Sequence, residues 1–320
     1  MSAARQWRAT HETGGHIICS ALEHDSVLKC CARVAEIMHF DVSFILPKQE
    51  NGYRIDMTDI TPLLRPDTFL ICVMEVNNEL GTRNHVAQIA QEAALRGIAT
   101  LVDCTQGISS GGSSVAIASR IPCATYLTCS AHKFYGPTGV GLLIARRALE
   151  PLIVGGGQEQ GARGGTHNVA AIVGMAAALE ELHRTDYSSH YQALVNHLCM
   201  RLATSLPDAE FNVWPDAPGI VSLNCGSMIT SGHLASMLDS YGIAVSAGSA
   251  CDADHDETAG QFHASHVLTA LGLSETEIRN TIRVSFIRTT TMKDIDRLVF
   301  ALRDLYDLYY SSEKEPKITV

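Results

Sequence analysis

Thr128-Cys-Ser-Ala-His-Lys-Phe-Tyr-Gly-Pro-Thr-Gly-Val-Gly141 holds one lysine, Lys133, between small residues in an otherwise apolar part of the chain. Residues 125–127 indicate the end of a buried strand and residues 142–145 the start of another, with glycines and a proline between them. We therefore expect the Lys133 amine at a strand end, where α/β proteins bind ligands. A neutral amine there can form a Schiff base with a carbonyl. A solvated loop lysine is the alternative.

The chain around this segment alternates strands with helices. A helix is predicted over 26–38 and another over 86–97, where Gly97 stops the pattern. The predicted strands are 16–20, 41–46, 69–74 and 98–102. This alternation indicates an α/β fold whose mainly parallel sheet is covered on both faces, with ligands beyond the carboxyl ends of the strands. Residues 1–14 show no clear period and are expected to be irregular.

The pattern changes to shorter elements after about residue 180. We therefore predict a large cofactor-binding domain over 1–180 and a smaller α+β domain over 181–320. Helices are expected over 168–184, 187–206, 231–241 and 292–310. Strands are expected over 220–224 and 282–286, and residues 243–246 lead into the segment 247–251.

Polar residues fall where the predicted strands end. Asp103 and Gln106 follow the strand over 98–102, Asn78 lies in Glu75-Val-Asn-Asn-Glu79 after the strand over 69–74, and His24 follows the first strand. Each could be a helix cap or a turn residue. Beside a Schiff-base lysine, a carboxylate such as Asp103 can keep a pyridine nitrogen protonated and make the ring an electron sink.

The string Ser130-x-His132-Lys133-x-x-Gly-Pro-x-Gly-x-Gly resembles the pyridoxal 5′-phosphate lysine motif of the class V aminotransferase superfamily, in its cysteine desulfurase and selenocysteine lyase branch. The resemblance implies the fold of the fold type I pyridoxal-phosphate enzymes, with Lys133 as the Schiff-base lysine. It implies the following cofactor contacts: Ser130 and His132 beside the phosphate, Asp103 at the ring nitrogen, Gln106 and Asn78 at the phenolic oxygen, and His24 stacked on the ring.

A glycine-rich stretch, residues 155–166, is either a flexible linker or a phosphate-binding turn. It is similar to the family's Gly-Gly-x-Gln-Glu…Arg-x-Gly-Thr, in which the threonine, here Thr166, reaches the cofactor phosphate of the neighbouring subunit. The resemblance therefore implies a homodimer with shared sites.

The reacting groups of the second domain are predicted to be Cys251 and Arg283. Cys251 follows Gly-Ser-Ala and precedes a polar segment, and this segment resembles the family's catalytic-cysteine loop. Arg283 lies in an apolar strand and matches the family's arginine that binds the substrate carboxylate. By the same resemblance, Asn78 also contacts this carboxylate. A metal site of Cys251 with His255, His263 and His266 matches no common zinc spacing, so we predict no metal.

These residues imply a desulfurase or lyase reaction. Lys133 or His24 takes the α-proton, and Cys251 attacks the sulfur or selenium of L-cysteine or L-selenocysteine. Alanine leaves, and a persulfide remains on Cys251 for a sulfur-acceptor protein, as in iron–sulfur cluster assembly. A plain aminotransferase is a less favoured hypothesis, because its reaction has no role for Cys251.

The composition limits the classes of binding partner and the cellular compartment. The 320 residues are 46% hydrophobic and 18% charged, with a net charge of −10, so we expect a small substrate and no nucleic-acid partner. The ten cysteines show no framework spacing, and we expect free thiols in the cytoplasm, with the mitochondrion as the alternative. No apolar run is long enough to span a membrane, so no membrane partner is expected.

The resemblance covers residues from about 15 to 305 and begins partway into the family pattern. The family's opening segment and its Thr-Ser-Gly-Ala-Thr-Glu phosphate-binding turn have no match here. A second hypothesis is therefore a truncated, cofactor-poor member that acts as a non-catalytic dimer or interaction subunit.

Overall fold

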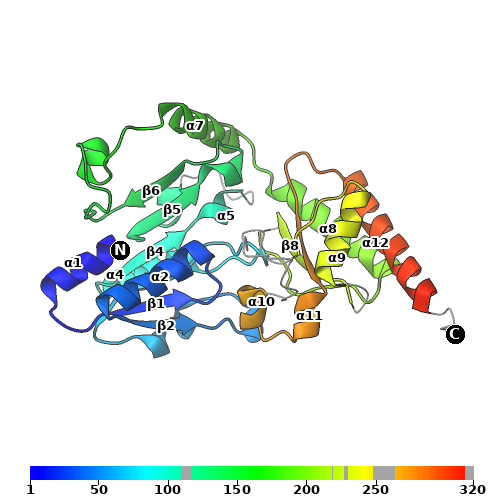
Figure 1. Ribbon diagram of the computed structural model, residues 1–320, viewed down its shortest axis with the longest axis horizontal. Coiled ribbons are helices and arrows are strands. Elements are labelled where there is room, and N and C mark those ends of the chain that lie inside the picture. Colours follow the sequence, from blue (N-terminus) through cyan, green and yellow to red (C-terminus); the bar gives the residue numbers. More distant parts are fainter. Residues whose placement is uncertain (110–116, 218, 227–229, 248–263, 314–320) are drawn as a thin grey trace, which may run out of the picture. The chain divides into compact units, whose positions relative to one another are not determined.

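The computed structural model describes residues 1–109, 117–217, 219–226, 230–247 and 264–313, with side chains through residue 309. The chain forms two compact units (Figure 1). The first comprises Met1–Asn78 and Thr82–Asp186, and the second Glu79–Gly81 and Tyr187–Val320. The predicted roles of the two parts stay predictions.

The first unit is built on a six-stranded sheet in the order β2-β1-β3-β4-β5-β6. All neighbouring strands are parallel except β5 and β6, which are antiparallel. The strands are β1 His16–Ser20, β2 Asp41–Ile45, β3 Thr68–Cys72, β4 Ala99–Asp103, β5 Tyr126–Ser130 and β6 Gly141–Ala145. The predicted mainly parallel α/β sheet is confirmed, and β1, β3 and β4 are buried along most of their length as their apolar sequences require.

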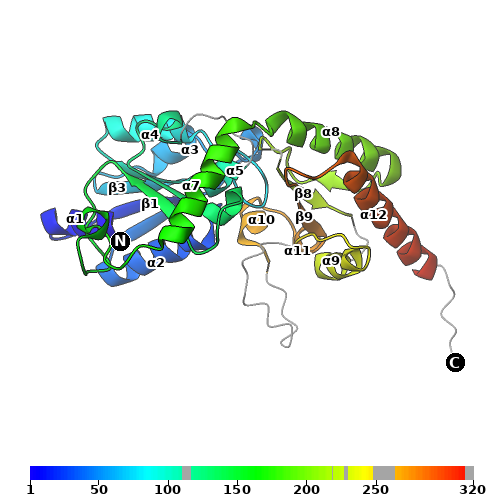
Figure 2. The ribbon, with the colours of Figure 1, turned by 90° about the horizontal axis from the view of Figure 1, so that it is seen from above.

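Helices cover both faces of this sheet (Figure 2). Helix α2, Asp25–Met38, buries Val27, Cys31 and Val34, which recur at helical spacing, and packs with α1 on one face. The opposite face carries α3 and α4. The helices of the first unit are α1 Ser2–Thr10, α2, α3 Met57–Ile60, α4 Val86–Leu95, α5 Thr105–Ser109, α6 Ile117–Arg120 and α7 Val169–Arg184.

The expectation of an irregular start was wrong, because residues 2–10 form helix α1. Tertiary packing decides this segment. Ala4 is 1% exposed, the Trp7 ring stacks on His11 and Phe69, and the Arg8 guanidinium lies over the Phe40 ring. Ala4, Trp7 and Arg8 share one helix face, but the mixed polar sequence hid that face from a search for apolar periodicity.

The second unit has a three-stranded antiparallel sheet, β7-β8-β9, covered by two long helices. Helices α8 and α12 pack against each other, and their apolar faces form one core with the sheet. The elements are α8 Ser188–Ser205, β7 Glu210–Phe211, β8 Ile220–Asn224, α9 Ser231–Ser240, α10 His266–Ala270, α11 Glu275–Arg279, β9 Thr281–Ser285 and α12 Met292–Glu313. The predicted strands at 220–224 and 282–286 and the closing helix are confirmed.

Ser246 pairs with β9 in an isolated bridge to Arg283, with two backbone hydrogen bonds of 2.7 and 3.1 Å. Among the helices of the described ranges, none has both the length and the apolar character needed to cross a membrane.

Candidate functional site

Lys133 lies in a short 3-10 turn, Ala131–Phe134, directly after β5. Ala131 and Phe134 are fully buried and fix the turn, whereas Lys133 is half-buried. The turn closes through a hydrogen bond of 2.9 Å from Gly136 N–H to the Ala131 carbonyl. A β-carbon at Gly136 would lie 2.9 Å from the Ala131 β-carbon, so glycine is needed for this close approach. The amine is therefore held at a strand end, as predicted.

Asp103 ends β4, the strand next to β5, and is paired in register with Thr128. Its carboxylate accepts a 2.9 Å hydrogen bond from Thr105 N–H. This bond begins α5, the helix that carries Gln106, whose side-chain oxygen accepts a 3.0 Å bond from Ser109. Asp103 is therefore a turn residue and also a carboxylate at the same sheet edge as the end of β5, so both readings of its sequence position hold.

His24 is the N-cap of α2. Its Nδ1 atom accepts a 3.1 Å hydrogen bond from Ser26 N–H. Since Nδ1 is the acceptor, a neutral His24 carries its proton on Nε2. The sequence allowed either a structural cap or a catalytic imidazole, and the structure shows that His24 is a cap with one ring nitrogen still available.

Glu23, next to His24, is a further residue of this edge, for which the sequence predicts no role. Its carboxyl group is 1% exposed and accepts a hydrogen bond from Met74 N–H, which ties the end of β1 to the end of β3. Burial raises the pKa of Glu23 well above its usual range, and the nearby charge of Asp103 raises it further. The position of an acid directly after an apolar strand was the available signal.

Asn78 is buried in the loop that follows β3. The loop is held by its neighbours: Asn77 donates to the Leu22 carbonyl at 2.8 Å, and Asn84 donates to the Met74 carbonyl at 2.9 Å. The next residue, Glu79, accepts a 2.6 Å bond from Ser265 within the second unit. The predicted motif Glu75–Glu79 is therefore a fixed loop.

A buried ion-pair network, missed in the sequence, braces the same region. The Glu75 carboxylate is 5% exposed and contacts Arg83 at 2.6 Å and Arg120 at 2.7 Å. Glu75 N–H also donates to the Asp103 carbonyl at 2.8 Å. The network ties β3, β4 and α6 together, and Arg83 and Arg120 lie 8 and 45 residues from Glu75.

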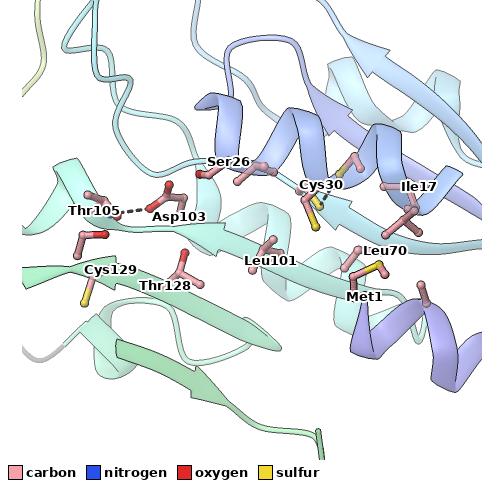
Figure 3. A pocket seen from close by; sticks show the side chains of 16 residues that line it. Met1, Ile17, Ser26, Cys30, Leu70, Leu101, Asp103, Thr105, Thr128 and Cys129 are labelled. Atoms are coloured by element: carbon pink, nitrogen blue, oxygen red, sulfur yellow. Dashed lines mark hydrogen bonds between the residues drawn. The ribbon is translucent and has the colours of Figure 1, made fainter. Parts of the chain in front are cut away.

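A pocket of about 280 Å³ adjoins these residues on the α2 face of the sheet. Figure 3 shows Asp103, Thr105 and Thr128 at one end, and Cys30, Ile17 and Met1 at the other. Ser130 also contributes to the wall. Carboxylate and hydroxyl groups of β4, α5 and β5 thus line the end of the pocket at the strand termini.

The glycine-rich stretch is a hydrogen-bonded loop. Gly164 N–H donates to the Ile153 carbonyl at 2.8 Å, and His167 contacts the Glu159 carboxylate at 2.8 Å. The Thr166 and His132 side chains are exposed. The linker reading is therefore unnecessary, and the role predicted for Thr166 stays a prediction.

Arg283 lies in β9 of the second unit, half-buried and opposite Ser222 of β8. Its backbone is paired on both sides, so the side chain is carried by a rigid element. Cys251, His255 and His263 lie outside the described residues. The predicted metal set thus has only His266 within them, and no group of three or more acids, histidines or cysteines in the described part of the chain is arranged to hold a metal.

Comparison with known families gives a match over residues 1–298 to the family described as Aminotransferase class-V. A protein named cysteine desulfurase from Trichormus azollae is 33% identical over 300 residues, which are 91% of this chain and 71% of the relative. Cysteine desulfurase IscS from Photorhabdus laumondii is 36% identical over 292 residues, which are 88% of this chain and 68% of the relative.

Solved structures give the same picture. A NifS-like protein superposes with a TM-score of 0.78 at 26% identity, covering 96% of this chain and 80% of that structure. DndA from Streptomyces lividans has a TM-score of 0.69 at 30% identity, covering 89% of this chain and 77% of that structure.

Proposed function

The chain belongs to the class V aminotransferase family, in its cysteine desulfurase branch, and we propose which of its residues carry out the removal of sulfur from L-cysteine that this membership brings. The family uses pyridoxal 5′-phosphate, and the products are L-alanine and a persulfide. The observation that supports the proposal best is the arrangement of Asp103 and Lys133, which are carried by the ends of the neighbouring strands β4 and β5.

The residues at this edge fit the cofactor. A pyridine nitrogen needs a carboxylate, which Asp103 supplies at the polar end of the pocket. A phosphate needs hydroxyl and imidazole donors, which Ser130 and His132 supply at the end of β5 and in the turn that follows it. Gln106 and Asn78 would bind the phenolic oxygen. When bound, the cofactor supplies an electron sink for the substrate α-carbon.

Other side chains have separate roles in the reaction. Lys133 binds the cofactor carbonyl and exchanges the α-proton of the substrate. His24 is fixed by Ser26 through Nδ1, so its Nε2 atom holds or moves a proton. Arg283 binds the substrate carboxylate, for which a guanidinium offers two parallel donors, and Asn78 assists it.

Cys251 is the proposed nucleophile and sulfur carrier. Its thiolate attacks the substrate sulfur, keeps that sulfur as a persulfide and passes it to an acceptor protein. The relatives named cysteine desulfurase favour cysteine over selenocysteine as the substrate. We place the reaction in the cytoplasm.

The decisive experiment compares the purified chain with Lys133→Ala. With pyridoxal phosphate added, the unmodified chain should show a visible absorption band that the variant lacks, and should form alanine from cysteine when a reducing thiol is present. A band without alanine formation would favour a plain aminotransferase. The absence of a band in both proteins would favour the non-catalytic interaction subunit and remove the enzyme proposal.

A homodimer is the proposed assembly. Large apolar side chains are exposed on the first unit near Thr166, in the loop before the glycine-rich stretch and at the start of α7: Leu152, Ile153, Val154, Val169 and Val173. We call these five residues the 152–173 patch. We propose that a second copy covers these exposed apolar side chains and brings its Thr166 to this part of the first unit.

A further inference from the structure

Three cysteines gather under helix α2, at the pocket end opposite Asp103. Cys19 of β1 and Cys72 of β3 are paired in register, and Cys31 of α2 reaches down to them. The Cys31 and Cys72 sulfurs are 4.0 Å apart. The exposed fractions of the three residues are 0, 5 and 0% for Cys19, Cys31 and Cys72, so the cluster is shielded from bulk solvent.

The cluster is not closed off from the pocket. Cys31 and Cys72 line the same cavity as Asp103 and Ser130, so one cavity of about 280 Å³ joins thiols to the proposed cofactor edge. A volume near the lower limit for ligand pockets suits a molecule of amino-acid size. The wall between the two ends is apolar, for example at Leu101 (Figure 3).

The thiols are not equivalent. Hydrogen bonding with Cys19, and then with Cys72, lowers the pKa of Cys31, whereas hydrogen bonding with Cys19 and Cys31, and then burial, raise the pKa of Cys72. A thiolate is the nucleophile in exchange with a sulfur–sulfur bond, so Cys31 is the reactive member.

We propose that Cys31 is a second sulfur-accepting site, which takes sulfane sulfur from the persulfide of a small thiol that enters this pocket. The inference rests on the proposed function in one respect, because a desulfurase supplies persulfide sulfur. The Cys31 thiolate attacks the outer sulfur of R–S–SH and forms a new sulfur–sulfur bond. The bond within the donor breaks, R–S⁻ leaves with the electron pair, and the transferred sulfur keeps its proton, so Cys31 becomes a persulfide.

The test supplies the sulfur donor as a chemical reagent and uses the Cys251→Ser variant, which lacks the proposed nucleophile. This variant, loaded with pyridoxal phosphate, is treated with cysteine persulfide, and peptide mass mapping locates each cysteine that gains one sulfur atom. We expect Cys31 to gain sulfur faster than the exposed Cys199, although Cys31 is only 5% exposed. Sulfur on Cys199 with none on Cys31 overturns the inference.

Two controls separate the pocket site from surface chemistry. Glutathione persulfide carries the same reacting group on a much larger molecule, so it should label exposed cysteines in preference to Cys31. In the Cys251→Ser background, Cys31→Ser should abolish the fast labelling, whereas Cys123→Ser, at an exposed position outside the pocket, should leave it intact. Equal labelling of Cys31 by both donors would contradict entry through the pocket.

The two proposals fail separately. Alanine formation by the unmodified chain without labelling of Cys31 would reject only the second site. Labelling of Cys31 without any alanine formation would reject only the proposed function. Because mapping is done in a chain that retains Cys31, the result does not depend on whether Cys31→Ser folds.

Discussion

The Glu75 carboxylate occupies the space beside Gly107: a β-carbon on Gly107 would lie 1.9 Å from Glu75 Oε2. Gly107 is one residue after Gln106 in α5, the helix that Asp103 begins. The absence of a side chain at position 107 therefore lets a buried ion pair lie directly against the segment proposed to hold the cofactor.

Gly107→Ala should destabilise the first unit by about 1–3 kcal/mol, because an added methyl group overpacks a buried site. Urea denaturation measures the loss. Combining it with Glu75→Ala should cost less than the sum of the two single changes, because the shortened side chain removes the clash. Gly157→Ala is the control, since no atom lies within 4 Å of its β-carbon position. Additive losses would contradict the contact.

Glu75→Gln should cost about 3–5 kcal/mol, because it leaves the Arg83 and Arg120 guanidiniums in a largely buried network without their carboxylate. Glu92→Gln breaks an exposed pair with Arg96 and should cost less than about 1 kcal/mol. Free energies of unfolding from urea titration give both values. Equal effects would show that Glu75 is no more important than a surface acid.

Stability should fall on acidification through His16. This fully buried ring lies between Thr68 Oγ1 at 2.8 Å and Ser43 Oγ at 2.9 Å. Burial, and then the charge of Arg65, lower its pKa below 6.5, against the opposing charges of Asp67 and Asp41.

The unfolded chain therefore binds a proton first, and the stability due to neutral His16 is complete above pH 6.5 and is lost as the pH falls toward the folded-state pKa. The slope for one group is at most about 1.4 kcal/mol per pH unit. Urea midpoints are measured for the unmodified chain and for His16→Gln on both sides of pH 6.5. Their difference separates the pH-dependent stability due to His16 from that due to Glu23. Parallel curves for the two proteins would exclude it.

Asp103→Asn should lower the rate of alanine formation on the order of 10²-fold or more, because the amide cannot hold a positive pyridinium. The fold should persist, since an amide oxygen can still accept the hydrogen bond from Thr105. Activity and the thermal midpoint are measured together. Full activity in this variant would remove Asp103 from the cofactor site.

Val173→Asp, in the 152–173 patch, should shift the chain from dimer to monomer in sedimentation experiments, because a charge in an apolar interface is costly to desolvate. Val173 is 62% exposed, so the substitution should leave the fold of one chain intact. Leu95→Asp is the matched control at an exposed apolar position outside the patch. An unchanged sedimentation coefficient in both variants would place the interface elsewhere.

Much of the site could be predicted from sequence because parallel strands bring their carboxyl ends to one edge. Lys133, Asp103 and His24 each follow an apolar run, and the sheet order places β4 beside β5. Local chemistry was also readable: His24 precedes a helix and Asp103 precedes a turn, and the structure shows both as caps.

The remaining features depend on packing between distant segments. Arg120 pairs with Glu75, which lies 45 residues away in the sequence, and the local sequence around neither residue predicts this pairing. The thiol cluster needs the register of Cys19 against Cys72, which only the sheet fixes. Helix α1 forms because Trp7 stacks on Phe69, a contact that no periodicity within α1 contains.

Strand β6 is the outer strand of the first sheet, next to the antiparallel β5, and consists of Gly141-Leu-Leu-Ile-Ala145 without a charge or a proline. Leu143 within it is 48% exposed. Backbone groups on such an edge can template the addition of another extended segment. The strand is thus a site at which chains could aggregate, and the charges of Arg146 and Arg147 directly after it oppose such addition.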